Sequence, residues 1–395
     1  MDLIERFVPA YRRAFAARPD VGHSRARFQK LAAGLTDAIS LNSGDPDLPA
    51  APEAVEASIR ALRDGRTHYA LGGLPELRAA IACKLAENGV TADPDAQVVI
   101  TNGAAEAISL VFQVLLAPGD EVLTTDPCYP GFVSGIAAAQ GIPVPVPITA
   151  ERLWEPDPAE IESKITPRTK AFVFANPGNP SGAVYSRETL QALVDLARRK
   201  NILMISDELF ERYVYDGFRH ISIASLPGAS DHTITIGGFS KSYCMTGWRL
   251  GWIVPPLWLA RPLTEMRYSM SMAAATANQW GAVAALSDAA VPYYDRVYKT
   301  FGERRVFFYE AFARMGLPQR RAPGAYMMIL DVQRTGRTAE EVAEIFIREA
   351  RVIVSPVSAL GTHGRAWVRV CLIQPLEALK EMANRLEPII GRLLD

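Results

Sequence analysis

Lys241 stands in the segment Gly237–Gly251, GGFSKSYCMTGWRLG, directly after residues 232–236, HTITI, whose pattern is typical of a buried strand. A lysine at the end of a buried strand is costly to desolvate, so its amine calls for a chemical role. A partly desolvated primary amine can attack an aldehyde and form a Schiff base. Arg249 follows on the same loop, and a fixed guanidinium is a good bidentate clamp for a phosphate.

Further residues that suit such a ligand follow other apolar runs. Asp207 comes after an apolar strand, where a buried carboxylate needs a cationic partner. Tyr129 lies between two prolines, where its ring can stack on a flat ligand, and Asn179 in NPGNPSG can aim an amide donor. The turn TNGAAEA opens a helix, where free backbone N–H groups suit a phosphate. Its expected contact residues are Gly103, Ala104 and Ala105.

Together these residues describe a site for a flat, phosphorylated ligand with a ring cation and an aldehyde, and pyridoxal 5′-phosphate has this chemistry. Lys241 would form the Schiff base and Asp207 would hold the proton on the pyridine nitrogen. Arg249 and the small-residue turn would grip the phosphate.

The elements that must position these residues are short apolar runs, each followed by a loop and a helix. The runs are AQVVIT, DEVLTT, TKAFVF, NILMIS and HTITI, and most are continuous rather than alternating. This pattern predicts strands buried on both faces, in a mostly parallel sheet covered by helices. Ligands bind beyond the carboxyl ends of such strands, where these motifs stand. From about residue 288 the chain has long helices plus AYMMILD, RVIVSP and AWVRVCL, which indicates a second, smaller α/β lobe.

Composition excludes several other classes. The 395 residues are 49% hydrophobic, enough for a large core, and the net charge of −1 argues against a nucleic-acid or membrane surface as the main partner. The four cysteines are far apart with no CxxC pair, so we expect neither a zinc site nor disulfides. No apolar run of about 18 residues occurs, and the N-terminal residues lack a signal-peptide core. We therefore expect a cytoplasmic protein.

Taken together, the motifs resemble the class I/II pyridoxal-phosphate-dependent aminotransferases of the aspartate aminotransferase fold (fold type I), from about Asn42 to Leu372. GFSKSYCMTGWRLGW resembles the family's lysine signature, with Lys241 as the Schiff-base residue. NPGNPSG resembles NPxNPTG, which implies that Asn179 hydrogen-bonds the phenolic oxygen of the cofactor. SDELF gives Asp207 the pyridine-nitrogen role, and DPCYPGF gives Tyr129 the ring-stacking role.

The resemblance also implies substrate and subunit contacts. NSGDPDLPAAP, which contains Gly44, is similar to the segment that closes over the substrate. THYALGGLPELR places Tyr69 where it reaches the phosphate of a neighbouring subunit, so a homodimer with shared active sites is implied. AWVRVCL places Arg369 where it clamps the substrate α-carboxylate. Ser240 is expected to contact the phosphate, because Gly238 replaces a serine of some relatives.

For the fold, the resemblance implies a large domain with a mostly parallel seven-stranded sheet sandwiched by helices, plus a smaller α/β domain. We expect residues 1–47 to form a basic N-terminal arm and part of the small domain. Residues 48–287 would form the large cofactor-binding domain, and residues 288–395 the C-terminal small domain. The implied reaction moves an amino group from an L-amino acid to a 2-oxo acid, with Lys241 as the base that carries the α-proton.

One departure from the family pattern concerns Phe210, where the family usually has a tyrosine. That hydroxyl donates to the cofactor's phenolic oxygen, and its absence predicts a raised pKa of the Schiff base and leaves a different reaction course open. Tyr213, three residues on, is not expected to face the same way.

Substrate class and reaction type leave alternatives. The turn at Gly103–Ala105 has alanines where some aspartate-specific relatives carry lysine, which favours a neutral or aromatic donor. Phe210 keeps open a lyase, decarboxylase or oxidase on the same cofactor. A non-catalytic regulator fused to a DNA-binding module is disfavoured, because the arm before Ala38 is too short for a winged helix plus linker and the charge is not basic. A nucleotide-binding α/β protein is disfavoured because no GxxxxGK[ST] or GxGxxG follows a strand. Cys128 and Cys244 are interpreted as packing thiols. Histidines without ligand spacing are His23, His68, His220, His232 and His363.

Overall fold

The computed structural model describes residues 27–28 and 30–395, so His23 and most of the predicted basic arm lie outside the described residues. None of the helices within these residues is long and apolar enough to cross a membrane.

A seven-stranded sheet with the order β2-β8-β7-β6-β5-β3-β4 forms the centre of the fold. Neighbouring strands run parallel except around β8, which is antiparallel to both β2 and β7. This confirms the predicted mostly parallel, seven-stranded sheet. Its strands are β2 (Val99–Thr101), β3 (Glu121–Asp126), β4 (Ile142–Pro147), β5 (Thr169–Ala175), β6 (Leu203–Asp207), β7 (Thr233–Gly238) and β8 (Gly251–Val254).

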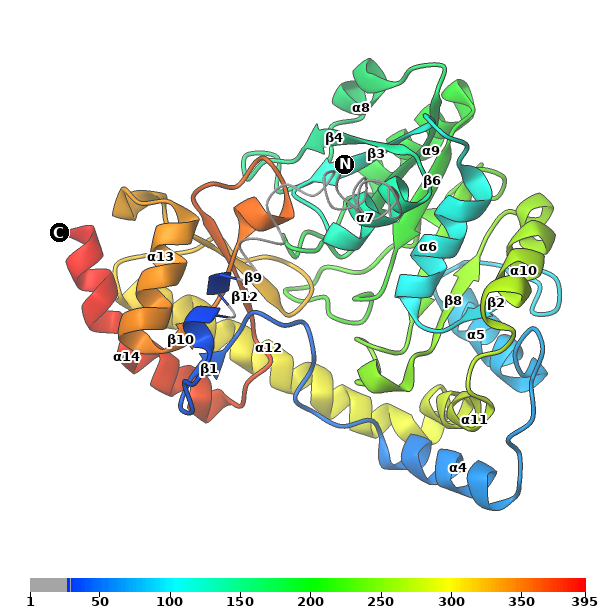
Figure 1. The fold of residues 1–395 in the computed structure, drawn as a ribbon, viewed down its shortest axis with the longest axis horizontal. Helices are drawn as coiled ribbons and strands as arrows, with labels where there is room; N and C mark the ends of the chain where they lie inside the picture. Colours follow the sequence, from blue (N-terminus) through cyan, green and yellow to red (C-terminus); the bar gives the residue numbers. More distant parts are fainter. Residues whose placement is uncertain (1–26, 29) are drawn as a thin grey trace, which may run out of the picture.

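Helices cover both faces of this sheet, as continuous apolar strands require (Figure 1). On β5, Val173 packs in the core with α6 (Ala104–Leu115), α7 (Pro130–Ala138) and α10 (Leu257–Ser271). The next residue, Phe174, packs in the opposite core with α8 (Pro158–Lys164) and α9 (Arg187–Lys200). A third core lies around Trp252 of β8 and is covered by α4 (Pro52–Arg63), α5 (Pro75–Glu87) and α11 (Thr276–Ala285).

Two strands of the sheet, β4 and β8, were not predicted from the hydrophobic pattern of the sequence. β4 has the sequence IPVPVP, and three prolines argue against a central strand. It is tolerated because β4 is the edge strand and pairs only with β3. β8 has four residues and directly follows the loop that carries Arg249, so it was hidden by the lysine signature.

The C-terminal part of the chain forms a separate core on a three-stranded antiparallel sheet, in the order β11 (Ser355–Pro356), β12 (Trp367–Cys371), β9 (Met327–Asp331). A short parallel pair, β1 (Ile39–Ser40) with β10 (Val352–Ile353), joins the N-terminal segment to this part. Figure 1 shows α12 (Val291–Arg314) running beneath both parts of the molecule. Its Phe301 belongs to the core of Trp252 and its Phe308 to the C-terminal core, so one helix spans the two. The domain boundaries at 47 and 287 therefore stay a prediction.

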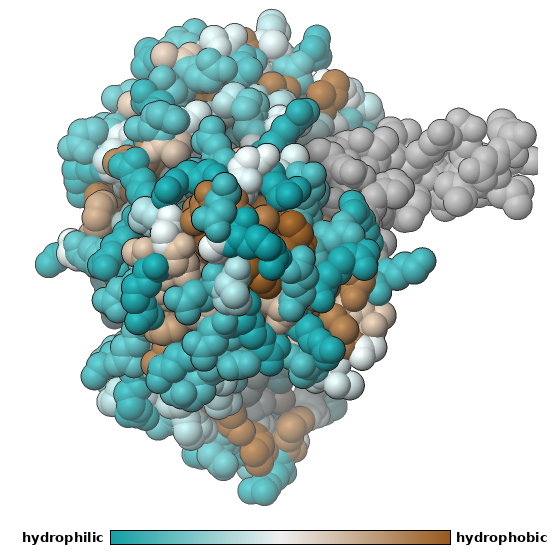
Figure 2. Space-filling view, turned by 90° about the vertical axis from the view of Figure 1, so that its left-hand side faces the viewer, coloured by the Kyte–Doolittle hydropathy of each residue, from teal (hydrophilic) through white to brown (hydrophobic). Residues whose placement is uncertain are grey.

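Further elements of this part are α13 (Ala339–Ile345) and α14 (Leu376–Leu394). A π-helical turn, Phe346–Ala350, follows α13. The face at this end of the molecule is mostly hydrophilic, with smaller hydrophobic patches between polar side chains (Figure 2).

Candidate active site

A cavity of about 620 Å³ lies between the carboxyl ends of the large-sheet strands and the C-terminal part of the chain. Most of the residues singled out from the sequence line it: Gly44, Ala104, Ala105, Tyr129, Asn179, Asp207, Phe210, Ser240, Lys241, Arg249 and Arg369. Gly103 lies just behind Ala104, while Tyr69 is 69% exposed and is not among the lining residues.

Lys241 lies on the loop after β7, and its Nζ donates a hydrogen bond of 2.7 Å to the carbonyl oxygen of Gly44. Burial lowers the pKa of this amine, while the charge of Asp45 opposes the shift. Tyrosine hydroxyls hold the loop backbone: Tyr213 donates to the Lys241 carbonyl at 3.0 Å and Tyr298 to the Ser242 carbonyl at 2.8 Å. The amine is thus a partly desolvated nucleophile on a fixed backbone.

Asp207 is the last residue of β6, and its carboxylate accepts a 3.1 Å hydrogen bond from the Leu209 N–H. Burial, reinforced by the charge of Glu208, raises the pKa of Asp207 to about 7. The Leu209 N–H and the charge of Lys241 act in the opposite direction. A buried carboxyl group with a raised pKa can pair with a cationic ring nitrogen. The positive charge would lower the pKa of the carboxyl group toward its ordinary range.

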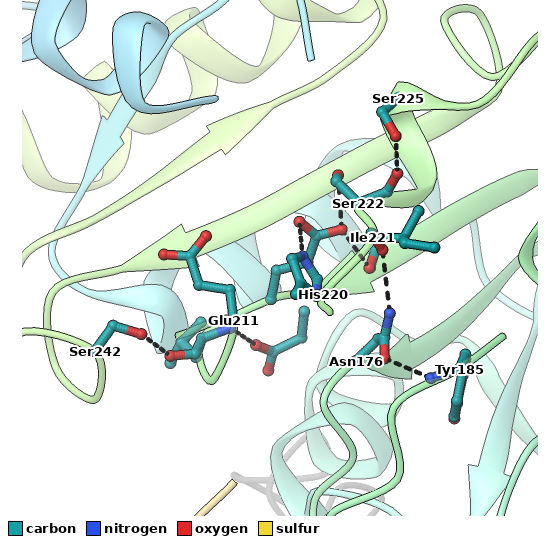
Figure 3. A network of polar contacts seen from close by, with 12 residues as sticks. Asn176, Tyr185, Glu211, His220, Ile221, Ser222, Ser225 and Ser242 are labelled. Carbon is teal, nitrogen blue, oxygen red and sulfur yellow. Dashed lines mark hydrogen bonds and ion pairs between the residues drawn. The ribbon is translucent and has the colours of Figure 1, made fainter. Parts of the chain in front are cut away.

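Behind Asp207, Glu208 is the centre of a buried polar network. Its carboxylate accepts from Ser206 Oγ at 3.0 Å and from Ser222 Oγ at 2.9 Å, and it lies 3.1 Å from His220 Nε2. Figure 3 shows His220 and Ser222 in this network, with Asn176 nearby. Asn176 Nδ2 donates to the Ile221 carbonyl at 3.3 Å. The network fixes the end of β6.

The sequence reading missed Glu208 and treated His220 as unremarkable. A second carboxylate directly after Asp207 at the end of an apolar strand was the available signal, because both cannot be buried without donors. Ser206, which supplies one donor, is close in sequence, but His220 and Ser222 come from a later loop, which no spacing rule connects to Glu208.

The phosphate end of the predicted site depends on close backbone approach. Gly103 caps the start of α6 with φ of 82°, and a Cβ there would lie 2.7 Å from Arg249 Nη2. Arg249 itself has φ of 56°, and its Nη1 donates to the Thr246 carbonyl at 2.9 Å. The first N–H groups of α6, the buried Ser240 and this guanidinium line one end of the cavity. Such an arrangement can bind a phosphate.

Two buried side-chain atoms beside the cavity lack a hydrogen-bond partner among the described residues, namely Asn179 Oδ1 and Arg369 Nε. Arg369 lies on β12 and donates from Nη2 to the Asn42 carbonyl at 2.8 Å, so its guanidinium is held at one side only. Buried polar atoms in native structures are normally paired. These two are therefore available to a bound cofactor or substrate.

Phe210 lines the cavity and packs edge-on against Tyr326 with ring centroids 5.2 Å apart. Tyr213 does not supply the missing hydroxyl, because its own hydroxyl is bonded to the Lys241 carbonyl, as expected from the sequence. Tyr129 caps the start of α7 and packs edge-on against Phe132 with centroids 5.6 Å apart.

Two cysteines lie close to the site residues in sequence. Burial raises the pKa of both the Cys128 and the Cys244 thiols to about 12, which is consistent with packing and not with nucleophilic attack. His363 contacts the buried Asp126 through Nδ1 at 3.1 Å. Over the described residues, no cluster of three or more His, Cys, Asp or Glu side chains is arranged to hold a metal ion.

This geometry agrees with the family assignment. Residues 36–386 match the family Aminotransferase class I and II, and the chain belongs to this family. An aspartate aminotransferase from Pyrococcus abyssi is 35% identical over 363 residues, which cover 91% of this chain and 93% of the relative. An aromatic-amino-acid aminotransferase from Thermococcus litoralis is 34% identical with the same coverage.

The structural comparison points the same way. The crystal structure of an aromatic aminotransferase from Pyrococcus horikoshii superposes with a TM-score of 0.88 at 33% identity, over 92% of this chain and 99% of the other. The protein is therefore an aminotransferase that depends on pyridoxal 5′-phosphate. The residues present fit this cofactor. The partly desolvated amine of Lys241, the carboxyl group of Asp207 with its raised pKa, and Arg249, which packs closely against Gly103, lie at one cavity.

Proposed function

We propose that this aminotransferase uses a neutral or aromatic L-amino acid as donor, with Lys241 as the cofactor lysine. The carrying observation is the charge of the cavity lining. Within the described residues, its cations are Lys241, Arg249 and Arg369, and the turn beside the phosphate end offers Ala105. One of these cations is the Schiff-base amine, one binds the phosphate and one binds the α-carboxylate, so the described part of the lining has no further cation for a side-chain carboxylate. Both donor classes occur among the names of the similar proteins, one of which is named for aspartate and another for aromatic amino acids.

The apolar residues of the lining support the same donor class. Phe28, Ile108, Met327 and Leu360 give parts of the cavity wall an apolar character. An apolar or aromatic side chain placed there would be desolvated at little cost, whereas a carboxylate would lose its hydration without a partner.

The proposed roles follow from the contacts. When bound, the cofactor supplies an aldehyde that condenses with an amine and a ring that accepts the electron pair of the Cα–H bond. Asp207 holds the proton on the ring nitrogen, and Arg249 with the start of α6 binds the phosphate. Arg369 directs its unpaired Nε to the substrate α-carboxylate. Lys241, whose pKa burial lowers, takes the α-proton once its amine is free.

Asn179 and Tyr129 complete the proposed cradle. The half-buried Asn179 side chain would donate its amide N–H to the cofactor's phenolic oxygen, and the Tyr129 ring would cover the cofactor face. Gly44, whose carbonyl holds the lysine, lies in the segment that closes over the substrate.

The proposal includes a homodimer with shared active sites. Tyr69 is 69% exposed, and its loop is tied to the start of α11 by the Thr276 hydroxyl, which donates to the His68 carbonyl at 2.7 Å. Further apolar side chains exposed on the same stretch of loop and on the end of α10 are Leu71, Tyr268, Met270 and Met272. Exposed apolar side chains on these two segments favour a twofold interface, through which Tyr69 would reach the partner's phosphate.

A cytoplasmic location is also proposed. All four cysteines are free, Cys83 among them on the surface, which suits a reducing compartment.

The donor class is tested by a visible absorption scan of the holoenzyme while single amino acids are added without any 2-oxo acid. The expected result is loss of the long-wavelength band with neutral or aromatic donors at concentrations where aspartate has little effect. If aspartate converts the band most efficiently, the proposed donor class is wrong. If ammonia, carbon dioxide or peroxide accumulates instead, the side reaction of a lyase, decarboxylase or oxidase dominates.

A further inference from the structure

The carbonyl oxygen of Gly44 accepts two hydrogen bonds at the reactive end of Lys241. Nζ of Lys241 donates to it at 2.7 Å, and the hydroxyl of Tyr326 donates to it at 2.8 Å. Gly44 is far from both donors in sequence, yet a Cβ at this position would lie 3.6 Å from Nζ. One backbone atom therefore connects the cofactor lysine to Tyr326, a residue to which no sequence motif assigns a role.

Tyr326 is held rigidly where it is. It directly precedes β9, is fully buried, and stacks on Phe301 with ring centroids 4.8 Å apart. Tyr213 meets it edge-on at 4.9 Å and Phe210 at 5.2 Å. Burial keeps the pKa of the Tyr326 hydroxyl well above its usual range, so this group remains a donor at every working pH.

Sharing the acceptor has a chemical consequence for Lys241. The amine must leave the Gly44 carbonyl and lose its extra proton before it can attack an aldehyde. The Gly44 carbonyl already accepts a hydrogen bond from Tyr326. It therefore stabilises the ammonium form of Lys241 less than a carbonyl with no other donor would. When the lysine leaves, the half-buried oxygen keeps Tyr326 as a partner and is not left unsatisfied. Both effects favour the free, neutral amine.

Other charged and titratable groups also act on Lys241. Asp45 favours the ammonium form, and so does the Asp207 carboxylate when ionised, whereas Arg249 and Arg369 disfavour it. Cys371 on β12 acts in the same direction as Asp45, with an effect smaller than that of Asp45 but larger than that of either arginine. These influences are present in any variant of Tyr326, so the hydroxyl can be tested against a constant background.

We propose that Tyr326 is a positioning residue for the cofactor lysine: through the Gly44 carbonyl, its hydroxyl sets where the Lys241 amine rests and how readily it leaves. The inference rests on the proposed role of Lys241. It also gives a purpose to the ring that packs on Phe210, since the hydroxyl absent from position 210 is present on its edge-on neighbour.

The test uses Tyr326→Phe, which removes only the hydroxyl. The apoenzyme is mixed with pyridoxal 5′-phosphate, and the rate at which the lysine-bound band appears is followed from neutral to alkaline pH. Loss of the hydroxyl strengthens the hold of Gly44 on the ammonium group. The midpoint of the profile therefore moves up by roughly half to one pH unit, and recombination at neutral pH slows by about three- to tenfold.

Binding of pyridoxamine 5′-phosphate, which cannot condense with a lysine, is measured in parallel and is expected to be unchanged. The matched control is Tyr309→Phe, which deletes another buried hydroxyl, one that accepts the Ala322 N–H at 2.7 Å. It should leave the recombination profile in place.

Two outcomes overturn the inference. The profile of Tyr326→Phe coincides with that of the wild type, or pyridoxamine 5′-phosphate binding weakens as much as recombination slows, which would mean a general loss of the cradle. Failure of the underlying assignment is recognised separately, because Lys241→Ala would then still develop the lysine-bound band.

Discussion

The side of the cavity formed by the strand ends of the large sheet is polar, and its side chains are fixed by hydrogen bonds. Asp207 accepts from the Leu209 N–H, and Arg249 donates to the Thr246 carbonyl. The opposite side, formed by the C-terminal part of the chain and Phe28, carries Arg369 together with the apolar residues Met327 and Leu360. In the proposed assignment, the first side holds the cofactor and the second faces the substrate.

This difference matters for how mutations act. A change on the polar side removes a charge or a proton acceptor from a buried place, where its loss is not compensated by water. A change on the opposite side alters shape or adds a charge next to the substrate side chain, which discriminates between donors by smaller energies.

The largest effect is expected for Asp207→Asn. It removes a buried charge partner worth about 3–5 kcal/mol, so kcat/KM falls by roughly 10²- to 10⁴-fold. The apoenzyme should respond in the opposite sense. The pKa of Asp207 is raised to about 7 from a value near 3.8, so the folded protein binds the proton more tightly and stability falls as pH rises between these values. The Asp207→Asn variant has no carboxyl group at this position, so its stability does not fall with rising pH for this reason.

We therefore expect the Asp207→Asn apoenzyme to be more stable than the wild type above pH 7, by roughly 2–4 kcal/mol, and similar to it below pH 4. Urea unfolding of both apoenzymes across this range measures the difference. A wild-type stability that does not fall between these pH values would contradict a raised pKa, whatever the activity does.

Next in size is Arg369→Leu, on the substrate side. It leaves the α-carboxylate without its clamp and should lower kcat/KM by about 10²- to 10³-fold, for the amino acid and the 2-oxo acid alike. Arg369→Lys keeps the positive charge but loses the bidentate geometry of the guanidinium group. Its kcat/KM should lie between those of the wild type and Arg369→Leu. Affinity for the cofactor is measured by fluorescence and should not change.

The exposed Arg365, four residues earlier, provides the matched control as Arg365→Leu. Weakened cofactor binding in Arg369→Leu would show that this arginine supports the fold or the cofactor instead of the substrate.

The same comparison explains how far the sequence could be read. Lys241, Asp207 and Arg249 were found because charged residues after apolar strands are conspicuous and stand in recognisable motifs. Phe28 and Leu360 could not be assigned, because an apolar residue that lines a pocket has the same pattern as one in a core. Tyr326 meets Gly44 across 282 positions of sequence, and no local rule links them. β4 was obscured because its prolines are acceptable only at an edge, which requires the topology.

A smaller effect is expected for Ala105→Lys, which places a cation at the exposed start of α6 inside the cavity. A carboxylate side chain would gain a partner there, so the kcat/KM ratio of aspartate over a neutral donor should rise by roughly tenfold, or about 1.4 kcal/mol. Ala105→Gln has similar length without charge and should leave the ratio nearly unchanged. Equal shifts in both variants would mean that bulk at this turn, and not charge, changes the donor preference.

The smallest effect expected is that of Phe210→Tyr, which restores a hydroxyl on the polar side without adding charge. Donation to the cofactor's phenolic oxygen favours the deprotonated form of the lysine-bound cofactor, so its spectroscopic pKa should fall by about one unit relative to the wild type. A pH titration of the visible band in both holoenzymes gives the two values directly. Because Phe210 and Tyr326 are edge-on neighbours, the same titration in Phe210→Tyr combined with Tyr326→Phe separates the two hydroxyls. Additive shifts would show that one acts on the cofactor and the other on the lysine, whereas equal titrations of wild type and Phe210→Tyr would mean that position 210 does not control this proton.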